Sequence, residues 1–132
     1  MSQIKVEYIG DLRTHSTHLD SGDEIVTDAP KDNQGLGRKF SPTDLLASSL
    51  GSCLLTIMGI VAKRHKIDMI GSIAKIKKTM SESPRRISEL YIDISMNKKI
   101  DEKNKLILQR ASEHCPVHNS LSKQIDIKIN FK

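Results

Sequence analysis

The chain has 132 residues, enough for one domain (1–132) with a modest hydrophobic core. Its two cysteines are too few for a disulfide-stapled secreted scaffold, and residues 1–5 lack the pattern of a secretory signal, so we expect a reducing, cytoplasmic environment. A net charge of +5 raises the question of nucleic acid, but the basic residues are dispersed and only 3% of residues are aromatic. We therefore expect no nucleic-acid partner.

The first third of the sequence predicts an antiparallel β-meander. Short extended runs at 3–9 and 12–18 flank an expected turn at Gly10-Asp11, and a third run covers 24–27. Residues 28–37 are rich in turn-forming residues and poor in apolar ones. This stretch predicts a loop, and loops of this length often border a functional site or an interface.

A long helix is expected to follow. Ser41 is suited to the N-cap, Pro42 to the first helical position, and Asp44 completes a capping box. Residues 45–62 carry no charge and are long enough to span a bilayer, but their serines and glycines, with strands on both sides, favour a buried helix ending near His65. A helix without a polar stripe must be covered on nearly all sides, and one small sheet covers only one of them. We therefore expect a second copy of the chain to cover the other side, which gives a homodimer, and we expect no membrane.

The second half of the sequence predicts a hairpin, two helices and a last strand. The hairpin strands are expected at 72–80 and 87–96, and the second of them alternates clearly between apolar and polar residues. Helices are expected at 101–113 and 116–121, and an alternating strand at 125–132. In the first of these helices, we expect the inward residues to be Leu106, Ile107 and Ala111. This order of elements indicates an α+β fold.

Cys53 and Cys115 are the candidate reactive residues. Cys115 precedes Pro116 and resembles an N-cap, where backbone N–H groups and the helix dipole would favour the thiolate and lower the pKa. The alternative is a small hydrophobic residue at a helix junction. Cys53, among Leu54 and Ile57, is by itself equally compatible with a core position. We hypothesise that the fold brings both thiols into one cleft.

His114, Cys115 and His118 are the candidate ligands of a metal site. Three ligands within five residues leave little room for a tetrahedral site, and no second cluster completes it. We therefore expect no metal.

Two segments carry a resemblance to a known family. Residues 40–53 (FSPTDLLASSLGSC) and residues 115–121 (CPVHNSL) resemble the OsmC/Ohr family, and the similarity extends over nearly the whole chain, including residues 28–30 and 84–87. The resemblance implies an OsmC-like fold in which two long central helices of an intertwined homodimer pack between sheets.

The resemblance also implies a chemistry. In this family the cysteine matching Cys53 attacks an organic or hydrogen peroxide as thiolate and becomes a sulfenic acid. The cysteine matching Cys115 then forms a disulfide with it, and a dithiol reductant restores the pair without metal or organic cofactor. The apolar surroundings of Leu54 and Met58 would accept the alkyl tail of a peroxide.

One position departs from the family pattern. Well-studied members carry a glutamate directly after the helix-start proline, where it orients an arginine onto the reactive cysteine. Here this residue is Thr43, and Asp44 points about 100° away around the helix. Arg38 and Arg13 are the candidates for the arginine, and we expect Thr43 and Arg38 to bind substrate. The alternative is a non-catalytic protein of the same fold that binds a small hydrophobic ligand.

Overall fold

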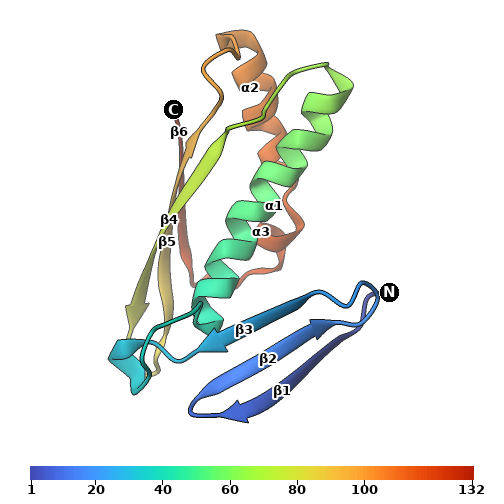
Figure 1. Ribbon diagram of the computed structural model, residues 1–132. Coiled ribbons are helices and arrows are strands. Elements are labelled where there is room, and N and C mark those ends of the chain that lie inside the picture. The colour runs from blue at the N-terminus through green and yellow to red at the C-terminus, as the bar shows by residue number, and fades with distance from the viewer. The chain divides into compact units, whose positions relative to one another are not determined.

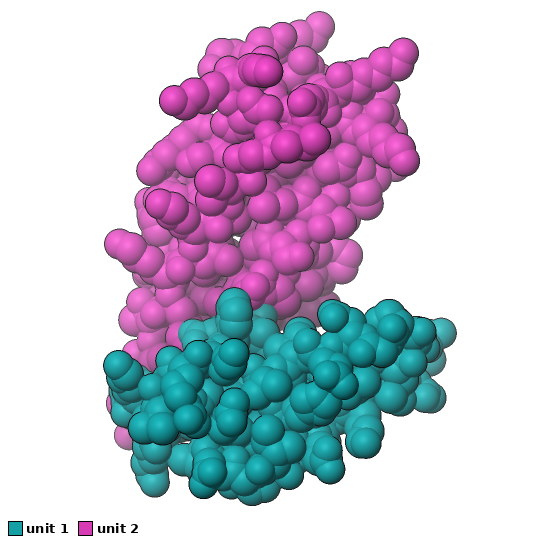
Figure 2. All heavy atoms as spheres, viewed as in Figure 1, with its two compact units in different colours: residues 1–46 teal, residues 47–132 magenta.

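The computed structural model describes residues 1–132, which pack into two compact units. The first unit is residues 1–46 and the second is residues 47–132, shown in different colours in Figure 2. Helix α1 (Pro42–Arg64) begins in the first unit and continues through the second.

The first unit is built on an antiparallel sheet of order β1-β2-β3 (Figure 1). Its strands are β1 (Ile4–Gly10), β2 (Arg13–His18) and β3 (Glu24–Asp28), which form the predicted meander. Leu12, expected in the second strand, lies in the turn instead. Asp11 and Leu12 have φ of 53° and 60°, the left-handed backbone that a tight two-residue hairpin turn requires.

Residues 1–46 contain no buried hydrophobic side chain. The buried residues here are polar, namely Thr27, Asp28 and Ser41, whereas the apolar core begins at Ala47. Apolar side chains of β1 remain at the surface, with Tyr8 65% exposed. A small sheet without an apolar interior is not stable by itself and needs a further apolar surface to cover it.

The start of α1 has the predicted capping box. The Ser41 hydroxyl accepts a hydrogen bond from the backbone N–H of Asp44 at 3.1 Å, and the Asp44 carboxylate accepts one from the backbone N–H of Ser41 at 3.0 Å. The helix ends at Arg64, one residue before the predicted end, and Lys66 then adopts a positive φ of 56°. Local sequence signals therefore define both ends of this helix.

Within the second unit, α1 buries one face and leaves another open. Its exposed residues include Ser52, Thr56 and Ile60, the last with 47% of its surface accessible. By length and composition α1 could cross a membrane, but core helices of soluble proteins meet the same criteria. In the most apolar 18-residue stretch of α1, 33% of the residues are buried. Its buried residues are Ala47, Leu50, Gly51, Leu54, Met58 and Ala62.

A three-stranded sheet of order β4-β5-β6 packs with α1 in the second unit. Figure 1 shows α1 along one face of β4 (Ile73–Ser81), β5 (Arg86–Ser95) and β6 (Asp126–Phe131). β4 and β5 are antiparallel, whereas β5 and β6 are parallel. The predicted alternation of β5 is confirmed, since Leu90, Ile92 and Ile94 are fully buried. The other face is polar; for example, the amide of Asn130 donates to Asp93 at 2.9 Å.

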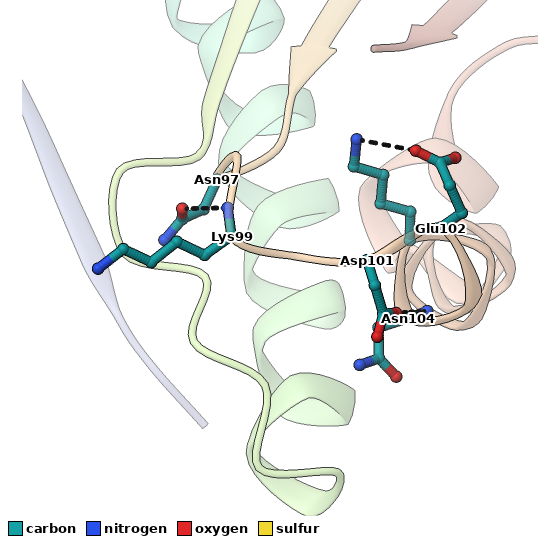
Figure 3. A network of polar contacts seen from close by, with 6 residues as sticks. Asn97, Lys99, Asp101, Glu102 and Asn104 are labelled. Atoms are coloured by element: carbon teal, nitrogen blue, oxygen red, sulfur yellow. Dashed lines mark hydrogen bonds and ion pairs between the residues drawn. The ribbon is translucent and has the colours of Figure 1, made fainter.

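Helix α2 (Glu102–Ala111) starts at an Asp101 cap, whose carboxylate accepts the backbone N–H of Asn104 at 2.8 Å (Figure 3). One expectation for this helix is wrong: Leu106 is 53% exposed, and the fully buried residue is Leu108. Leu108 shares its face with Ala111, three residues on, whereas Leu106 points about 160° away from Leu108. The predicted 101–113 helix is also shorter, because residues 112–114 form a 3₁₀ turn before α3 (Pro116–Ser120). The fold is α+β, as predicted.

Candidate functional site

Cys115 occupies the N-cap of α3, as predicted. Its backbone is extended, Pro116 follows at the start of the helix, and the Cys115 Sγ accepts a hydrogen bond from the backbone N–H of His118 at 3.4 Å. The residue is fully buried, with 0% of its surface exposed. The cap fixes the direction of this sulfur.

The structure brings the two cysteines together. Cys53 lies on the part of α1 that belongs to the second unit, is half-buried, and lies near enough to Cys115 to raise the pKa of that residue. Both thiols are free. Residues 62 positions apart in the sequence therefore form one sulfur pair within a single unit.

The cap acts on Cys115 in the predicted direction, but other effects outweigh it and the net pKa of this thiol is raised. Burial raises the pKa of the Cys115 thiol, and the hydrogen bond with Cys53 raises it further, against the opposing effect of the backbone N–H groups of His118 and Val117. Complete loss of water around the sulfur outweighs the few donors of a five-residue helix. Cys115 therefore keeps its proton and can donate it in a hydrogen bond to the Cys53 sulfur.

Leu54 and Met58, predicted to line a substrate pocket, are core residues here. Both have 0% exposed surface on the buried face of α1. The structure would have to open before either side chain contacted a peroxide, so their binding role stays a prediction.

Arg38 is held by a buried carboxylate that the sequence analysis missed. The Nε of Arg38 donates to Asp28 Oδ2 at 2.9 Å, and the backbone N–H of Arg38 donates to the same oxygen at 3.1 Å. Asp28 is 1% exposed, whereas the Arg38 side chain is 48% exposed. The hydrogen bond from Arg38, aided by the charge of Arg13, holds the pKa of Asp28 below its usual value despite burial. The sequence signal that could have predicted this ion pair is an aspartate at the end of a strand, followed by a loop that contains two glycines.

The lowered pKa of Asp28 predicts a loss of stability in acid. Asp28 stabilises the fold fully above the ordinary aspartate pKa of about 3.9, and this contribution disappears as the pH falls through the lower folded value. We expect the unfolding free energy of an Asp28→Asn variant to fall less steeply than that of the wild type below about pH 4. Urea unfolding between about pH 2 and pH 6 measures this. Parallel curves for the two proteins would contradict the assignment.

The structure also places the other residues that the sequence analysis singled out. Thr43 lies in the first turn of α1, where its hydroxyl is hydrogen-bonded to that of Ser41 at 3.2 Å. Arg13 is the register partner of Asp28 across β2 and β3. No group of three His, Cys, Asp or Glu side chains is placed to hold a metal ion, so His114, Cys115 and His118 do not form a ligand set.

The sequence profile of the OsmC-like protein family matches residues 34–130, which is most of the chain. The chain belongs to this family, and the resemblance seen in residues 40–53 and 115–121 is confirmed. No curated protein sequence matches the chain.

Solved structures share the fold over the whole chain. A protein from Psychrobacter arcticus 273-4, provisionally described as an osmotic stress induced and detoxification response protein, is 48% identical with a TM-score of 0.94, covering 100% of this chain and 96% of that one. An organic hydroperoxide resistance protein OsmC from Legionella pneumophila is 16% identical (TM-score 0.78; 100% and 96% covered). The organic hydroperoxide resistance protein OhrB of Bacillus subtilis is 20% identical (TM-score 0.71; 100% and 98% covered). At these lower identities, the last two establish similarity of fold.

Proposed function

We propose that this protein is a cysteine-dependent peroxidase that reduces organic hydroperoxides or hydrogen peroxide and so protects against peroxide stress. The observation that carries the proposal is the proximity of the two free thiols, Cys53 and Cys115, which is close enough for Cys53 to raise the pKa of Cys115. Family membership supports it, as do the names of the Legionella and Bacillus proteins that share the fold.

Cys53 is the attacking residue in this proposal. Its thiol is half-buried, whereas Cys115 is fully buried and its raised pKa keeps it protonated. The protonated and buried Cys115 is a poor nucleophile, because the thiolate is the form that attacks. The accessibility of Cys53 and the burial of Cys115 therefore assign different roles to the two sulfurs.

The proposed reaction has three steps. The Cys53 thiolate attacks one peroxide oxygen, the O–O bond breaks, and the products are a Cys53 sulfenic acid and, after protonation, an alcohol or water. The Cys115 sulfur then attacks the sulfenic sulfur, which releases water and leaves a Cys53–Cys115 disulfide. A dithiol reductant finally exchanges with this disulfide and is itself oxidised. The sulfur chemistry itself requires no metal or organic cofactor.

The other predicted assignments belong to the same proposal. Arg38 and Thr43 are proposed to contact the peroxide, and Leu54 and Met58 to contact its alkyl part when the core opens. The protein is proposed to act in the cytoplasm, where dithiol reductants keep the pair reduced.

A homodimer is part of the proposal because each chain leaves surfaces uncovered. Residues 1–46 lack a buried apolar side chain, and Ile60 of α1 is 47% exposed. The two units also differ in charge: residues 1–46 have five Lys or Arg against eight Asp or Glu, and residues 47–132 have sixteen against eight. Opposite net charges favour contact between the first unit of one copy and the second unit of another.

We expect sedimentation equilibrium to give twice the chain mass of 14.8 kDa. The contact needs no disulfide, so a variant with both cysteines replaced by serine is expected to have the same doubled mass. A single-chain mass at about 10 μM protein would contradict the dimer, because an interface covering this much apolar surface should be stable there.

A peroxidase assay with dithiothreitol as reductant and cumene hydroperoxide as substrate tests the activity. With dithiothreitol removed before the peroxide is added, we expect a Cys115→Ser variant to reduce about one equivalent of peroxide per chain and to accumulate a sulfenic acid that dimedone captures. The wild type with dithiothreitol present should turn over repeatedly. Absence of any sulfenic acid in Cys115→Ser would contradict the proposal. Stabilisation by a hydrophobic ligand that survives loss of either sulfur would favour a binding protein instead.

A further inference from the structure

We propose that Cys115 is a redox-sensitive cap of helix α3: its reduced sulfur holds the start of this helix, and formation of the Cys53–Cys115 disulfide removes the cap and releases the helix. The inference deepens the proposed function and rests on it, because the disulfide is the one that the proposed reaction forms. The reduced and oxidised chains then differ in the order of residues 116–120 rather than in their overall fold.

The Cys115 sulfur is the main link between α3 and the interior of the second unit. This sulfur accepts the backbone N–H of His118 at 3.4 Å, and Cys115 has 0% exposed surface. None of the five residues of α3 is itself buried. Most of the stability of a short helix comes from tertiary packing, which α3 lacks, so its N-cap contributes a large share.

Disulfide formation moves sulfur away from the position that caps the helix. Bonded sulfurs lie about 2 Å apart, whereas non-bonded heavy atoms stay roughly 3.5 Å or more apart, so at least one sulfur moves by more than about 1 Å. Cys53 is part of a 23-residue helix in which Leu50 and Leu54 have no exposed surface, so this helix resists displacement. Cys115 therefore moves. A hydrogen bond to sulfur that starts at 3.4 Å tolerates little further separation, and the cap is lost.

The segment that carries α3 has fixed ends and open space beside it. On its N-terminal side, Ser112 is buried and its hydroxyl donates to a backbone carbonyl of α2 at 2.6 Å. On its C-terminal side, the carbonyl of Gln124 accepts a hydrogen bond from Arg86 Nη1 at 3.3 Å. Between these two points, His118 lines an open cavity of about 400 Å³. The helix can shift into this space without displacing packed side chains, which confines the change to residues 115–123.

A released α3 makes the disulfide more accessible to the reductant. In the reduced chain, Cys53 is half-buried and Cys115 has no exposed surface. A dithiol reduces a disulfide by attack of its thiolate on one of the two sulfurs, so the rate depends on access to them. Release of α3 uncovers the second sulfur, and the oxidised chain therefore offers both sulfurs to the reductant.

Amide hydrogen exchange at His118 in the full-length chain tests the loss of the cap. The disulfide is made with diamide, a diazene that takes up the two electrons and two protons that the thiols lose, so no peroxide is involved. We expect the His118 amide to exchange at least about fivefold faster in the oxidised chain than in the reduced one. The matched control is the amide of Asn104, which the Asp101 carboxylate caps at 2.8 Å, and its rate should stay within about twofold.

Two variants of Cys115 separate the cap from the oxidation. Reduced Cys115→Ala lacks the acceptor, so its His118 amide should exchange as fast as in the oxidised wild type. Cys115→Ser keeps a side chain that caps helices well and should match the reduced wild type. Diamide should change the His118 rate in neither variant, because neither can form the disulfide. Equal rates in the two variants would show that the sulfur does not act as the cap and would overturn the inference.

The outcomes distinguish this inference from the proposed function. A chain that fails to reduce cumene hydroperoxide loses the proposed function, whereas faster His118 exchange in its diamide-made disulfide form supports the redox-sensitive cap. An active peroxidase with the same His118 rate in both states overturns the inference alone. Equal acceleration at His118 and Asn104 shows a general loosening and also overturns it. Failure of diamide to join the two sulfurs overturns both. If Cys115→Ala does not fold, the comparison of reduced and oxidised wild type decides.

Discussion

Replacing Cys53 with serine is expected to lower kcat/KM for hydroperoxide reduction by at least about 1,000-fold. The serine hydroxyl keeps its proton at neutral pH and cannot form a sulfenic acid, so the first step of the proposed reaction is lost. Cys115 cannot replace it as nucleophile, because this residue is fully buried and its pKa is raised. Consumption of cumene hydroperoxide at about pH 7 with dithiothreitol in excess measures the loss.

Ser52→Ala is the matched control for this prediction. Ser52 is the exposed neighbour of Cys53 on α1, and its substitution tests whether a change to the helix surface alone affects activity. We expect this variant to keep activity within about twofold of the wild type. Wild-type peroxide reduction by Cys53→Ser, or an equal loss in Ser52→Ala, would remove the proposed role of Cys53.

Replacing Leu54 with alanine is expected to reduce the free energy of unfolding by about 2–5 kcal/mol. Leu54 has no exposed surface and lies on the face of α1 that is buried in the second unit, so truncation removes apolar contacts and leaves a cavity. The unfolding midpoint in urea should fall without a large change in slope. The comparison must be made at one protein concentration, because a dimer couples stability to concentration.

Leu106→Ala is the matched control for the same chemical change. Leu106 is 53% exposed, so its truncation is expected to cost no more than about 0.5 kcal/mol. Equal destabilisation by the two substitutions would contradict the burial pattern of α1 and α2. Leu54→Met, which nearly conserves volume, should cost less than about 1.5 kcal/mol.

Local chemistry explains which parts of the fold were predictable from sequence. The Ser41–Asp44 capping box, the Cys115-Pro116 helix start and the alternation of β5 depend on residues a few positions apart, and all three are present. The orientation of α2 was not predictable in the same way. Its short sequence offers apolar residues at three successive positions, 106–108, and tertiary packing selects Leu108 for the core.

The candidate site was predictable in composition but not in electrostatics. The two motifs identified Cys53 and Cys115, yet the direction of the Cys115 pKa depends on burial, which the motif does not encode. Asp28 was missed because its importance arises only when the loop closes and brings Arg38 back to the end of β3. Such contacts depend on the path of the backbone rather than on sequence spacing.

Disulfide mapping after peroxide treatment tests the pairing of the sulfurs most directly. The reduced protein is treated with one equivalent of cumene hydroperoxide, digested without reductant and analysed by mass spectrometry. We expect a single peptide pair that joins Cys53 to Cys115 within one chain, with the loss of both free thiols and of two hydrogen atoms. Two unmodified thiols after the peroxide has been consumed, or a Cys53 oxidised without any link to Cys115, would contradict a peroxidase built on this pair.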